Sequence, residues 1–286
     1  MKLETNEFGN TGLQVTRLGY GAMELREGPE DLANDLLNLV LDSGINFIDT
    51  SIDYGDSEKL IGKFISHRRS EFFLASKCGC PIGAGGDHIF TKENITNGIN
   101  QSLKLLKTDY LDLVQLHNPI KNVVEENDVI QTLLDIKQDG KIRFIGTSSV
   151  LPALSDHINM SVFDAFQIPY SALNRGHEKL ITSASKSGAG TIIRGGVSKG
   201  EFGRNREWDN FSKSNLDDLL DEGESRTSFL LRFTLSHPEL DTTIVGTKNT
   251  EHFKENIKTA SRGILSANIY EEAKKRLTLS GVFPAN

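Results

Sequence analysis

The sequence has few cysteines. Of its 286 residues only two are cysteine, Cys78 and Cys80, and Gly79 alone separates them. That spacing is too short for an ordinary structural disulfide, and two cysteines are too few for a disulfide framework. We expect reduced thiols and no bound metal, as is usual in the cytosol. The alternative is an open zinc site made by Cys78, Cys80 and the nearby His88, because zinc accepts two thiolates and one imidazole as ligands.

Long apolar runs and basic stripes are also missing. No apolar run approaches the roughly 18 residues that a membrane span requires. Residues 1–10 lack the apolar core of a secretory signal, so we expect a cytoplasmic protein. The net charge of -7, without a concentrated basic face, argues against nucleic acid as a partner, since an acidic surface repels phosphate backbones.

What is present is an ordinary globular composition. Hydrophobic residues make up 37% of the chain and charged residues 25%, which allows a sizeable core. The length of 286 residues is long for one domain, yet barrels of alternating strands and helices run to about 250 residues as a single unit. We therefore expect one domain over residues 1–286.

Apolar runs alternate with longer amphipathic segments, a pattern typical of repeated βα units and a parallel sheet. We count eight such units after an N-terminal hairpin that turns near Gly9 to Gly12. The predicted strands are 16–20, 45–48, 72–76, 111–116, 142–145, 163–168, 191–193 and 242–245. The predicted helices are 30–41, 58–65, 92–106, 124–138, 151–157, 227–235, 251–258 and a final one at 270–277.

The pattern predicts an α/β fold, a (β/α)8 TIM barrel with its active site at the C-terminal face of the strands. Between residues 195 and 226 lies the longest irregular stretch, glycine-rich at first and then polar and acidic. Long loops inside compact domains are usually functional or disordered, so we expect this one to cover the barrel mouth.

Four polar side chains stand at or just past the ends of three consecutive predicted strands. Asp49 follows the apolar run 45–48, Tyr54 lies in the loop after it, Lys77 follows 72–76, and His117 follows 111–116. If these strands are parallel neighbours in one barrel, the four side chains meet at one mouth. Each alone has a structural explanation, such as a turn or a strand-end charge; together they predict a catalytic site.

The chemistry of these four groups suits proton donation. Free tyrosine has a pKa of about 10 and is a poor acid unless a positive charge stabilises its phenolate. Lys77 supplies such a charge, and Asp49 would keep that ammonium protonated and in place. His117 could donate to a carbonyl oxygen or relay a proton.

The chain resembles the aldo-keto reductases over nearly its whole length. The segments that carry the resemblance are residues 12–21, 49–55, 76–77, 114–119, 146–149, 167–171 and 246–256. The resemblance implies that Asp49, Tyr54, Lys77 and His117 form a catalytic tetrad. It implies an NAD(P)H-dependent enzyme in which hydride passes from the nicotinamide to a carbonyl carbon while Tyr54 protonates its oxygen.

The resemblance also implies a cofactor site without a Gly-x-Gly-x-x-Gly fingerprint, and none is present at the first βα turn. Ser148, Ser149 and Gln167 match positions that hold the nicotinamide carboxamide, and Tyr170, in the motif 167–171, is also expected to contact the cofactor. The segment that matches the clasp of the adenosine phosphate supplies Gly246, Thr247, Lys248, His252, Glu255 and Asn256. We expect NADPH, with NADH possible as the alternative.

Three positions depart from the family pattern. Ser149 stands where asparagine is more common, and His252 stands where many NADPH-preferring members have arginine. Neutral imidazole cannot make the forked, permanently charged contact that arginine makes with phosphate, and Lys248 could compensate. Arg194 replaces an aromatic residue that stacks under the nicotinamide. Its guanidinium could stack there instead, or it could bind a pyrophosphate or pair with an acid.

The substrate expected from the resemblance is a small carbonyl or alcohol compound. Met23, His88 and Trp208 are candidate substrate-binding residues, with Phe202 in the same stretch as Trp208. The alternative for Phe202 and Trp208 is that they anchor the long loop. A second function is a cofactor-binding regulatory subunit similar to the β-subunits of potassium channels. A third is a different barrel enzyme that uses zinc at Cys78 and Cys80.

Overall fold

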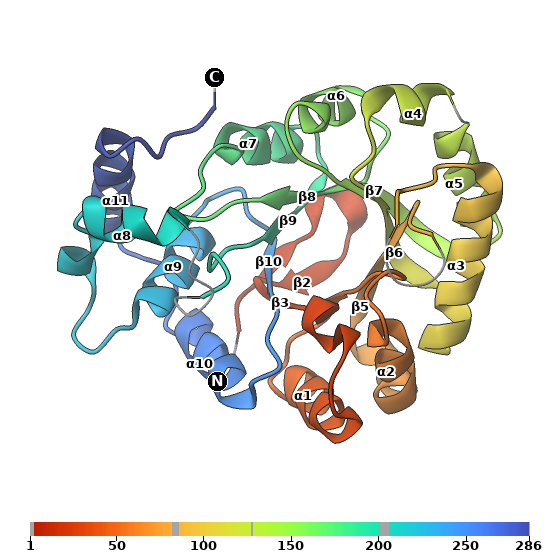
Figure 1. The fold of residues 1–286 in the computed structure, drawn as a ribbon, viewed down its shortest axis with the longest axis horizontal. Helices are drawn as coiled ribbons and strands as arrows, with labels where there is room; N and C mark the ends of the chain where they lie inside the picture. Colours follow the sequence, from red (N-terminus) through yellow and green to blue (C-terminus); the bar gives the residue numbers. More distant parts are fainter. Residues whose placement is uncertain (1–2, 82–85, 127, 201–205, 286) are drawn as a thin grey trace.

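Eight parallel strands pair in a closed ring (Figure 1). The computed structural model describes residues 3–81, 86–126, 128–200 and 206–285. Its barrel strands follow one another around the ring in chain order. They are β3 (Leu18–Gly21), β4 (Phe47–Asp49), β5 (Phe73–Cys78), β6 (Leu111–His117), β7 (Ile142–Ser148), β8 (Ala165–Pro169), β9 (Gly190–Arg194) and β10 (Thr242–Val245). Because β10 pairs with both β9 and β3, the ring has no open edge, and the predicted (β/α)8 barrel is confirmed.

Helices surround this barrel (Figure 1). They are α1 (Glu30–Asp42), α2 (Ser57–Phe64), α3 (Lys92–Leu106), α4 (Lys121–Glu126), α5 (Val129–Gln138), α6 (Ala153–Asn159), α7 (Glu178–Lys186), α8 (Asp209–Lys213), α9 (Arg226–Leu235), α10 (Thr250–Ser261) and α11 (Ala267–Leu279). Short 3-10 turns lie at η1 (Gly9–Thr11), η2 (Ala22–Arg26), η3 (Ser66–Glu71), η5 (Arg206–Trp208) and η6 (Leu216–Leu219). The larger apolar core packs between the helices and the outside of the barrel.

The predicted N-terminal hairpin is confirmed and closes one end of the barrel. Strand β1 (Thr5–Glu7) pairs antiparallel with β2 (Gln14–Thr16), and Gly12 adopts a left-handed φ of 73° at the turn. Phe8 and Val15 from the hairpin join the cluster inside the barrel, where the ring of Phe8 lies 5.7 Å from that of Phe47. The interior is thus filled at the N-terminal ends of the strands.

Strand alternation places polar side chains above this apolar interior. Residues two apart on a strand point to the same side of the sheet. Phe47, Ala75, Leu113, Ala165 and Ile192 all belong to the interior cluster. The residues two positions further along the same strands are Asp49, Lys77, Gln115, Gln167 and Arg194. The sequence alternation therefore directs these five side chains to the interior at the C-terminal end.

The prediction misses helices α7 and α8 and merges two others. Helix α7 lies between β8 and β9, where no helix is predicted. The predicted helix 124–138 is two helices, α4 and α5, and Asp128 between them has a left-handed φ of 50°. Lys77 lies within β5, whereas the sequence pattern places it just after the predicted strand 72–76.

The stretch 195–226, predicted to be irregular, contains η5, α8 and η6. Trp208 is buried and donates from its indole nitrogen to the Ser198 carbonyl oxygen at 3.1 Å. Its ring stacks on Phe211 of α8, which in turn meets Phe229 of α9 edge-on. These contacts fit the anchoring alternative for Trp208, while Phe202 lies outside the described residues.

Candidate functional site

The central feature of the mouth is a buried ion pair. Lys77 Nζ lies 2.7 Å from Asp49 Oδ2 and also donates to the Thr50 carbonyl oxygen at 2.8 Å. The Lys77 side chain has no exposed surface. Burial alone would lower the pKa of Lys77, but the charge of Asp49 and the interactions with Tyr54 outweigh burial and raise it. The ammonium therefore stays protonated at neutral pH.

Two glutamines hold the other oxygen of Asp49. Gln115 Nε2 donates to Asp49 Oδ1 at 2.8 Å, and Gln167 Nε2 donates to the same oxygen at 2.9 Å. Gln115 was not predicted as a site residue. The signal that could have found it is its position two residues before His117, on the same side of β6.

Tyr54 lies beside this pair in the loop between β4 and α2. Lys77 Nζ is 4.8 Å from the centre of the Tyr54 ring. Burial raises the pKa of Tyr54, and although Lys77 acts to lower it, burial prevails. Lys77 thus acts on the pKa of Tyr54 in the expected direction, but burial outweighs it. Tyr54 is a neutral phenol at neutral pH and carries a proton that it can donate.

His117 faces the Tyr54 ring edge-on, with the ring centres 6.3 Å apart. On the other side of the imidazole, Nδ1 lies 3.1 Å from Cys80 Sγ and 3.5 Å from Asp53 Oδ2. Burial alone would raise the pKa of Asp53, but its interaction with His117 outweighs burial and lowers it. The structure thus brings Asp49, Tyr54, Lys77 and His117 together, as the sequence predicts.

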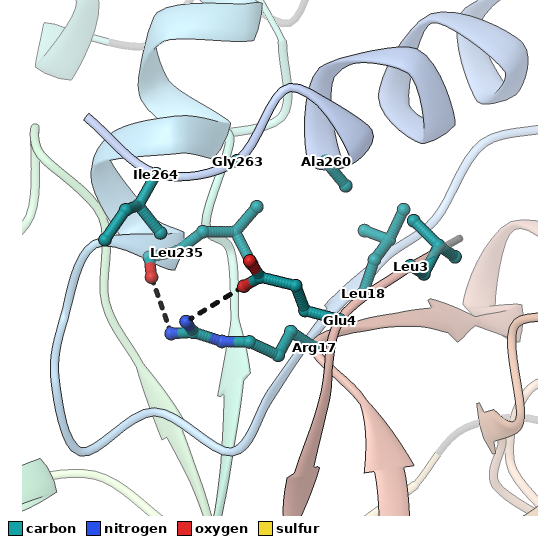
Figure 2. A pocket seen from close by; sticks show the side chains of 8 residues that line it. All are labelled: Leu3, Glu4, Arg17, Leu18, Leu235, Ala260, Gly263 and Ile264. Atoms are coloured by element: carbon teal, nitrogen blue, oxygen red, sulfur yellow. Dashed lines mark hydrogen bonds and ion pairs between the residues drawn. The ribbon is translucent and has the colours of Figure 1, made fainter. Parts of the chain in front are cut away.

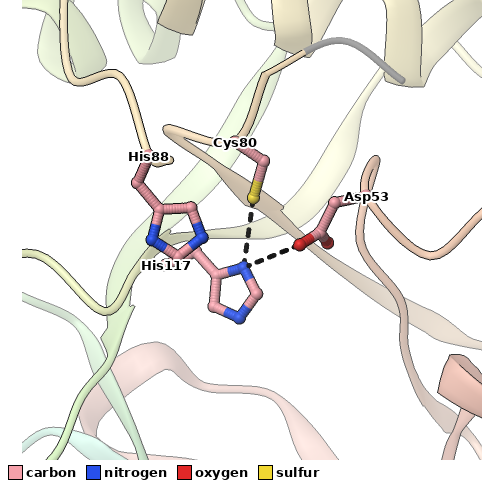
Figure 3. Close-up of side chains that lie close together, drawn as sticks. All are labelled: Asp53, Cys80, His88 and His117. Atoms are coloured by element: carbon pink, nitrogen blue, oxygen red, sulfur yellow. Dashed lines mark hydrogen bonds and ion pairs between the residues drawn. The ribbon is translucent and has the colours of Figure 1, made fainter. Parts of the chain in front are cut away.

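The side chain of His88, from the segment after β5, also approaches His117. The rings of His88 and His117 lie 4.7 Å apart at 37° (Figure 3). Burial lowers the pKa of His88, and the neighbouring His117 lowers it to a smaller extent. Burial raises the pKa of the Cys80 thiol to about 12. Cys78, in contrast, is buried in the apolar core at the end of β5 and takes no part in this group.

The predicted cofactor residues fall into two groups, of which the first lies at the barrel mouth. Ser148 Oγ donates to Gln167 Oε1 at 3.1 Å, and Ser149 donates from its backbone nitrogen to the Gln167 carbonyl oxygen at 3.3 Å. Arg194 ends β9, and Tyr54 and Asp49 act to raise its pKa, although burial lowers it overall. Arg194 therefore lies within electrostatic reach of the ion pair.

The second group surrounds the N-terminus of α10. Asn249 caps this helix by accepting from the backbone nitrogens of Glu251 and His252. Lys248 Nζ donates to the Glu27 carbonyl oxygen at 3.3 Å. The remaining members of this group are Gly246 and Thr247, which precede the helix, and Glu255 and Asn256 within it. A helix N-terminus with a lysine beside it attracts anions.

Other predicted residues lie in less expected surroundings. Tyr170 is 1% exposed, and its ring packs against Phe233 and His237 in the outer core. This packing does not support the predicted contact between Tyr170 and the cofactor. Met23 is 39% exposed in η2 and is available as a pocket wall. The predicted roles of Met23, His88 and Trp208 toward substrate stay predictions.

A small pocket lies at the opposite end of the barrel (Figure 2). Arg17, which precedes β3, donates to the Leu235 carbonyl oxygen at 2.6 Å and pairs with Glu4 at 3.7 Å. Leu235 at this pocket ends α9, and Gly263 follows the C-terminus of α10. The pocket is therefore remote from the strand ends that carry Lys77 and His117.

Among the described residues, no helix is both long enough and apolar enough to cross a bilayer.

Comparison with known proteins agrees with this geometry. A model of the aldo/keto reductase family matches residues 17–275. The uncharacterized oxidoreductase YqkF of Bacillus subtilis is 26% identical over 285 residues, covering 91% of this chain and 92% of that protein. L-galactose dehydrogenase of Arabidopsis thaliana is 29% identical over 284 residues, covering 90% and 88%.

A solved structure shares the fold closely. The aldo-keto reductase AKR11C1 from Bacillus halodurans, in its holo form, superposes with a TM-score of 0.86 at 26% identity and covers 96% of both chains. The family model spans most of the chain, and the barrel is the same. The chain therefore belongs to the aldo/keto reductase family and is an oxidoreductase that transfers hydride between a nicotinamide cofactor and a carbonyl compound.

Proposed function

We propose that this enzyme reduces small aldehydes or ketones with NADPH, and that Asp49, Tyr54, Lys77 and His117 carry out the chemistry. The observation that supports this most directly is the Asp49–Lys77 pair at 2.7 Å beneath the Tyr54 ring. Reduced nicotinamide, held by Ser148, Ser149 and Gln167, would supply a hydride to the carbonyl carbon. Tyr54 Oη donates its proton to the carbonyl oxygen, which yields the alcohol.

The remaining residues of the set hold this donor in place. Lys77 is fixed by Asp49 and the Thr50 carbonyl oxygen, so its charge stays next to Tyr54 as the phenolate forms. His117 faces Tyr54 across the mouth and orients the carbonyl oxygen between the two rings. The high pKa of Tyr54 suits the direction of reduction, because the phenol begins the step protonated.

The cofactor residues on the chain fit both ends of a phosphorylated dinucleotide. Ser148, Ser149 and Gln167 offer hydroxyl and amide groups to the carboxamide at the ends of β7 and β8. Lys248 and the N-terminus of α10, whose first turn contains His252, offer positive charge to the adenosine phosphate. This charge is the reason to propose NADPH over NADH.

The test of the mechanism is NADPH oxidation against a panel of aldehydes, ketones and sugars. The sugars are included because one relative is an L-galactose dehydrogenase. We expect Tyr54→Phe to lower kcat by about two orders of magnitude or more while cofactor binding stays unchanged, because only the general acid is removed. Tyr110→Phe, whose ring stacks under Arg69 on the outside of the barrel, is the matched control. Full activity in Tyr54→Phe would refute the proposed role.

The test of cofactor preference compares NADPH with NADH. We expect a higher kcat/KM with NADPH, and we expect Lys248→Ala to raise the KM for NADPH about tenfold with little effect on NADH, because only NADPH carries the second phosphate. Lys213→Ala, in α8, is the control for removing a lysine elsewhere. Equal use of both cofactors by the unmodified enzyme would contradict the preference.

A further inference from the structure

Four potential metal ligands converge beside the proposed catalytic set (Figure 3). Asp53 comes from the loop after β4, Cys80 and His88 from the segment after β5, and His117 from the end of β6. One ligand atom from each lies within 4.8 Å of all the others. Cys80 is buried and the other three are half-buried, so an ion could reach them from solvent.

One of the ligand-to-ligand distances already matches that of a shared zinc ion, and a second is slightly shorter. Zinc binds sulfur at about 2.3 Å and imidazole nitrogen at about 2.0 Å, so neighbouring ligands of a tetrahedral site lie roughly 3.3–3.6 Å apart. The structure has 3.1 Å between Cys80 Sγ and His117 Nδ1, and 3.5 Å between His117 Nδ1 and Asp53 Oδ2. The four ligand atoms lie within 4.8 Å of one another, so closing the widest separation requires an approach of about 1 Å, which side-chain rotations can supply.

The chemistry of the donors selects the kind of metal. One thiolate and two imidazoles favour zinc and similar late transition metals, and a carboxylate completes four-coordination. Magnesium and calcium prefer oxygen ligands only. Hydrogen bonds and an ion pair link Asp53, Cys80 and His117, and ring contacts of His88 with His117 and Phe90 hold a second imidazole beside them.

We propose that Asp53, Cys80, His88 and His117 form a zinc-binding site. His117 belongs both to this site and to the proposed catalytic set, but with different atoms. Its Nδ1 faces Cys80 and Asp53, whereas Nε2 lies at the far edge of the ring (Figure 3). The site differs from the zinc site considered from the sequence, because Cys78 has no part in it.

The first test uses cobalt as a spectroscopic substitute for zinc. We expect Co²⁺ to bind the purified full-length protein one to one and give a thiolate-to-cobalt charge-transfer band. Cys80→Ala should abolish that band, and Cys78→Ala should keep it. The two cysteines lie two residues apart in the same protein, which makes this a matched pair. Absence of a saturable band in the unmodified protein, or loss of the band only in Cys78→Ala, would overturn the proposal.

The second test does not depend on either cysteine variant folding. Zn²⁺ affinity is measured by competition with a chelating dye, with circular dichroism of each variant as a check of folding. His88→Ala should weaken Zn²⁺ binding at least about tenfold, whereas His67→Ala, at an exposed position on η3, should not. Mg²⁺ should not displace Zn²⁺. Equal affinity of the unmodified protein and His88→Ala would contradict the site. Neither test measures turnover, so the proposal stands or fails apart from the reductase mechanism.

Discussion

Glu58, in the first turn of α2, is a carboxyl group inside the protein. It is 1% exposed and accepts a hydrogen bond from Ser76 Oγ at 2.6 Å. Burial raises the pKa of Glu58 to about 7, against the opposing effect of the Ser76 hydrogen bond. Because the folded pKa lies above the ordinary value, the folded state binds this proton more tightly than the unfolded chain does. The group therefore favours folding at low pH, and this contribution is lost as pH rises through about 7.

We predict that Glu58→Gln makes stability less dependent on pH. Between pH 5 and pH 8 the free energy of unfolding of the unmodified protein should fall relative to the variant by on the order of 3 kcal/mol, the value of the pKa difference. Urea unfolding at several pH values measures this. The exposed Glu251→Gln should leave the pH profile unchanged. Parallel profiles for the unmodified protein and Glu58→Gln would show that the carboxyl is not protonated when buried.

At the scale of residues, the sequence predicts site residues at the ends of strands better than it predicts the residues that contact them. Asp49, Lys77 and His117 stand at the ends of apolar runs, a position visible in the sequence. Gln115 lies inside such a run, and its contact with Asp49 depends on the register between strands. The grouping of Cys80 with His117 depends on the path of a loop. No local pattern carries either kind of information.

Among the elements, the N-terminal hairpin has the clearest structural effect. Phe8 is 1% exposed and packs against Phe47 inside the barrel. It also occupies the space beside Gly190 of β9, where an added Cβ would lie 2.5 Å from its ring. The hairpin thus packs against β9 because the large Phe8 ring lies where Gly190 has no side chain.

We predict that Phe8→Ala destabilises the protein by about 3–5 kcal/mol, because it leaves a cavity where neighbouring strands cannot collapse. Chemical denaturation measures the loss. Leu279→Ala, at a position that is 80% exposed, should change stability by less than about 0.5 kcal/mol. If Phe8→Ala were as mild as Leu279→Ala, the hairpin would not contribute to the barrel core.

Elements with strong apolar periodicity are the ones that the sequence predicts. Helix α3 is predicted with its observed ends, and β10 likewise. Helix α7 is missed because its buried side chains include few apolar ones, namely Ile181 and Ala184. Its first turn is instead held by the Arg175–Glu178 pair, which a hydrophobic pattern does not detect. The break between α4 and α5 is also hidden, since the sequence around residue 128 keeps a helical pattern.

For the whole molecule, ring closure is the main constraint on how the chain unfolds. Each barrel strand is paired on both sides, so there is no edge at which partial unfolding would naturally stop. Trp208 is the sole tryptophan of the chain and packs through Phe211 onto α9. Its fluorescence therefore reports on the C-terminal half of the barrel.

We predict that Trp208 fluorescence and far-ultraviolet circular dichroism give the same urea midpoint, as expected if residues 1–286 unfold as one domain. Phe211→Leu should shift both midpoints together, because it weakens a contact of the shared core. A fluorescence midpoint clearly below the dichroism midpoint would instead show that the segment around α8 unfolds first.

The hydrogen bonds of Asp49 have a consequence for synthesis of the chain. Its carboxylate belongs to β4, and its donors come from β5, β6 and β8. During translation, residue 49 is synthesised 118 residues before Gln167. A nascent chain that has made only the first four barrel strands therefore has the lysine and the carboxylate, but not the full set of donors that holds them. The reductase site is completed only in the second half of synthesis, so truncated products cannot carry it intact.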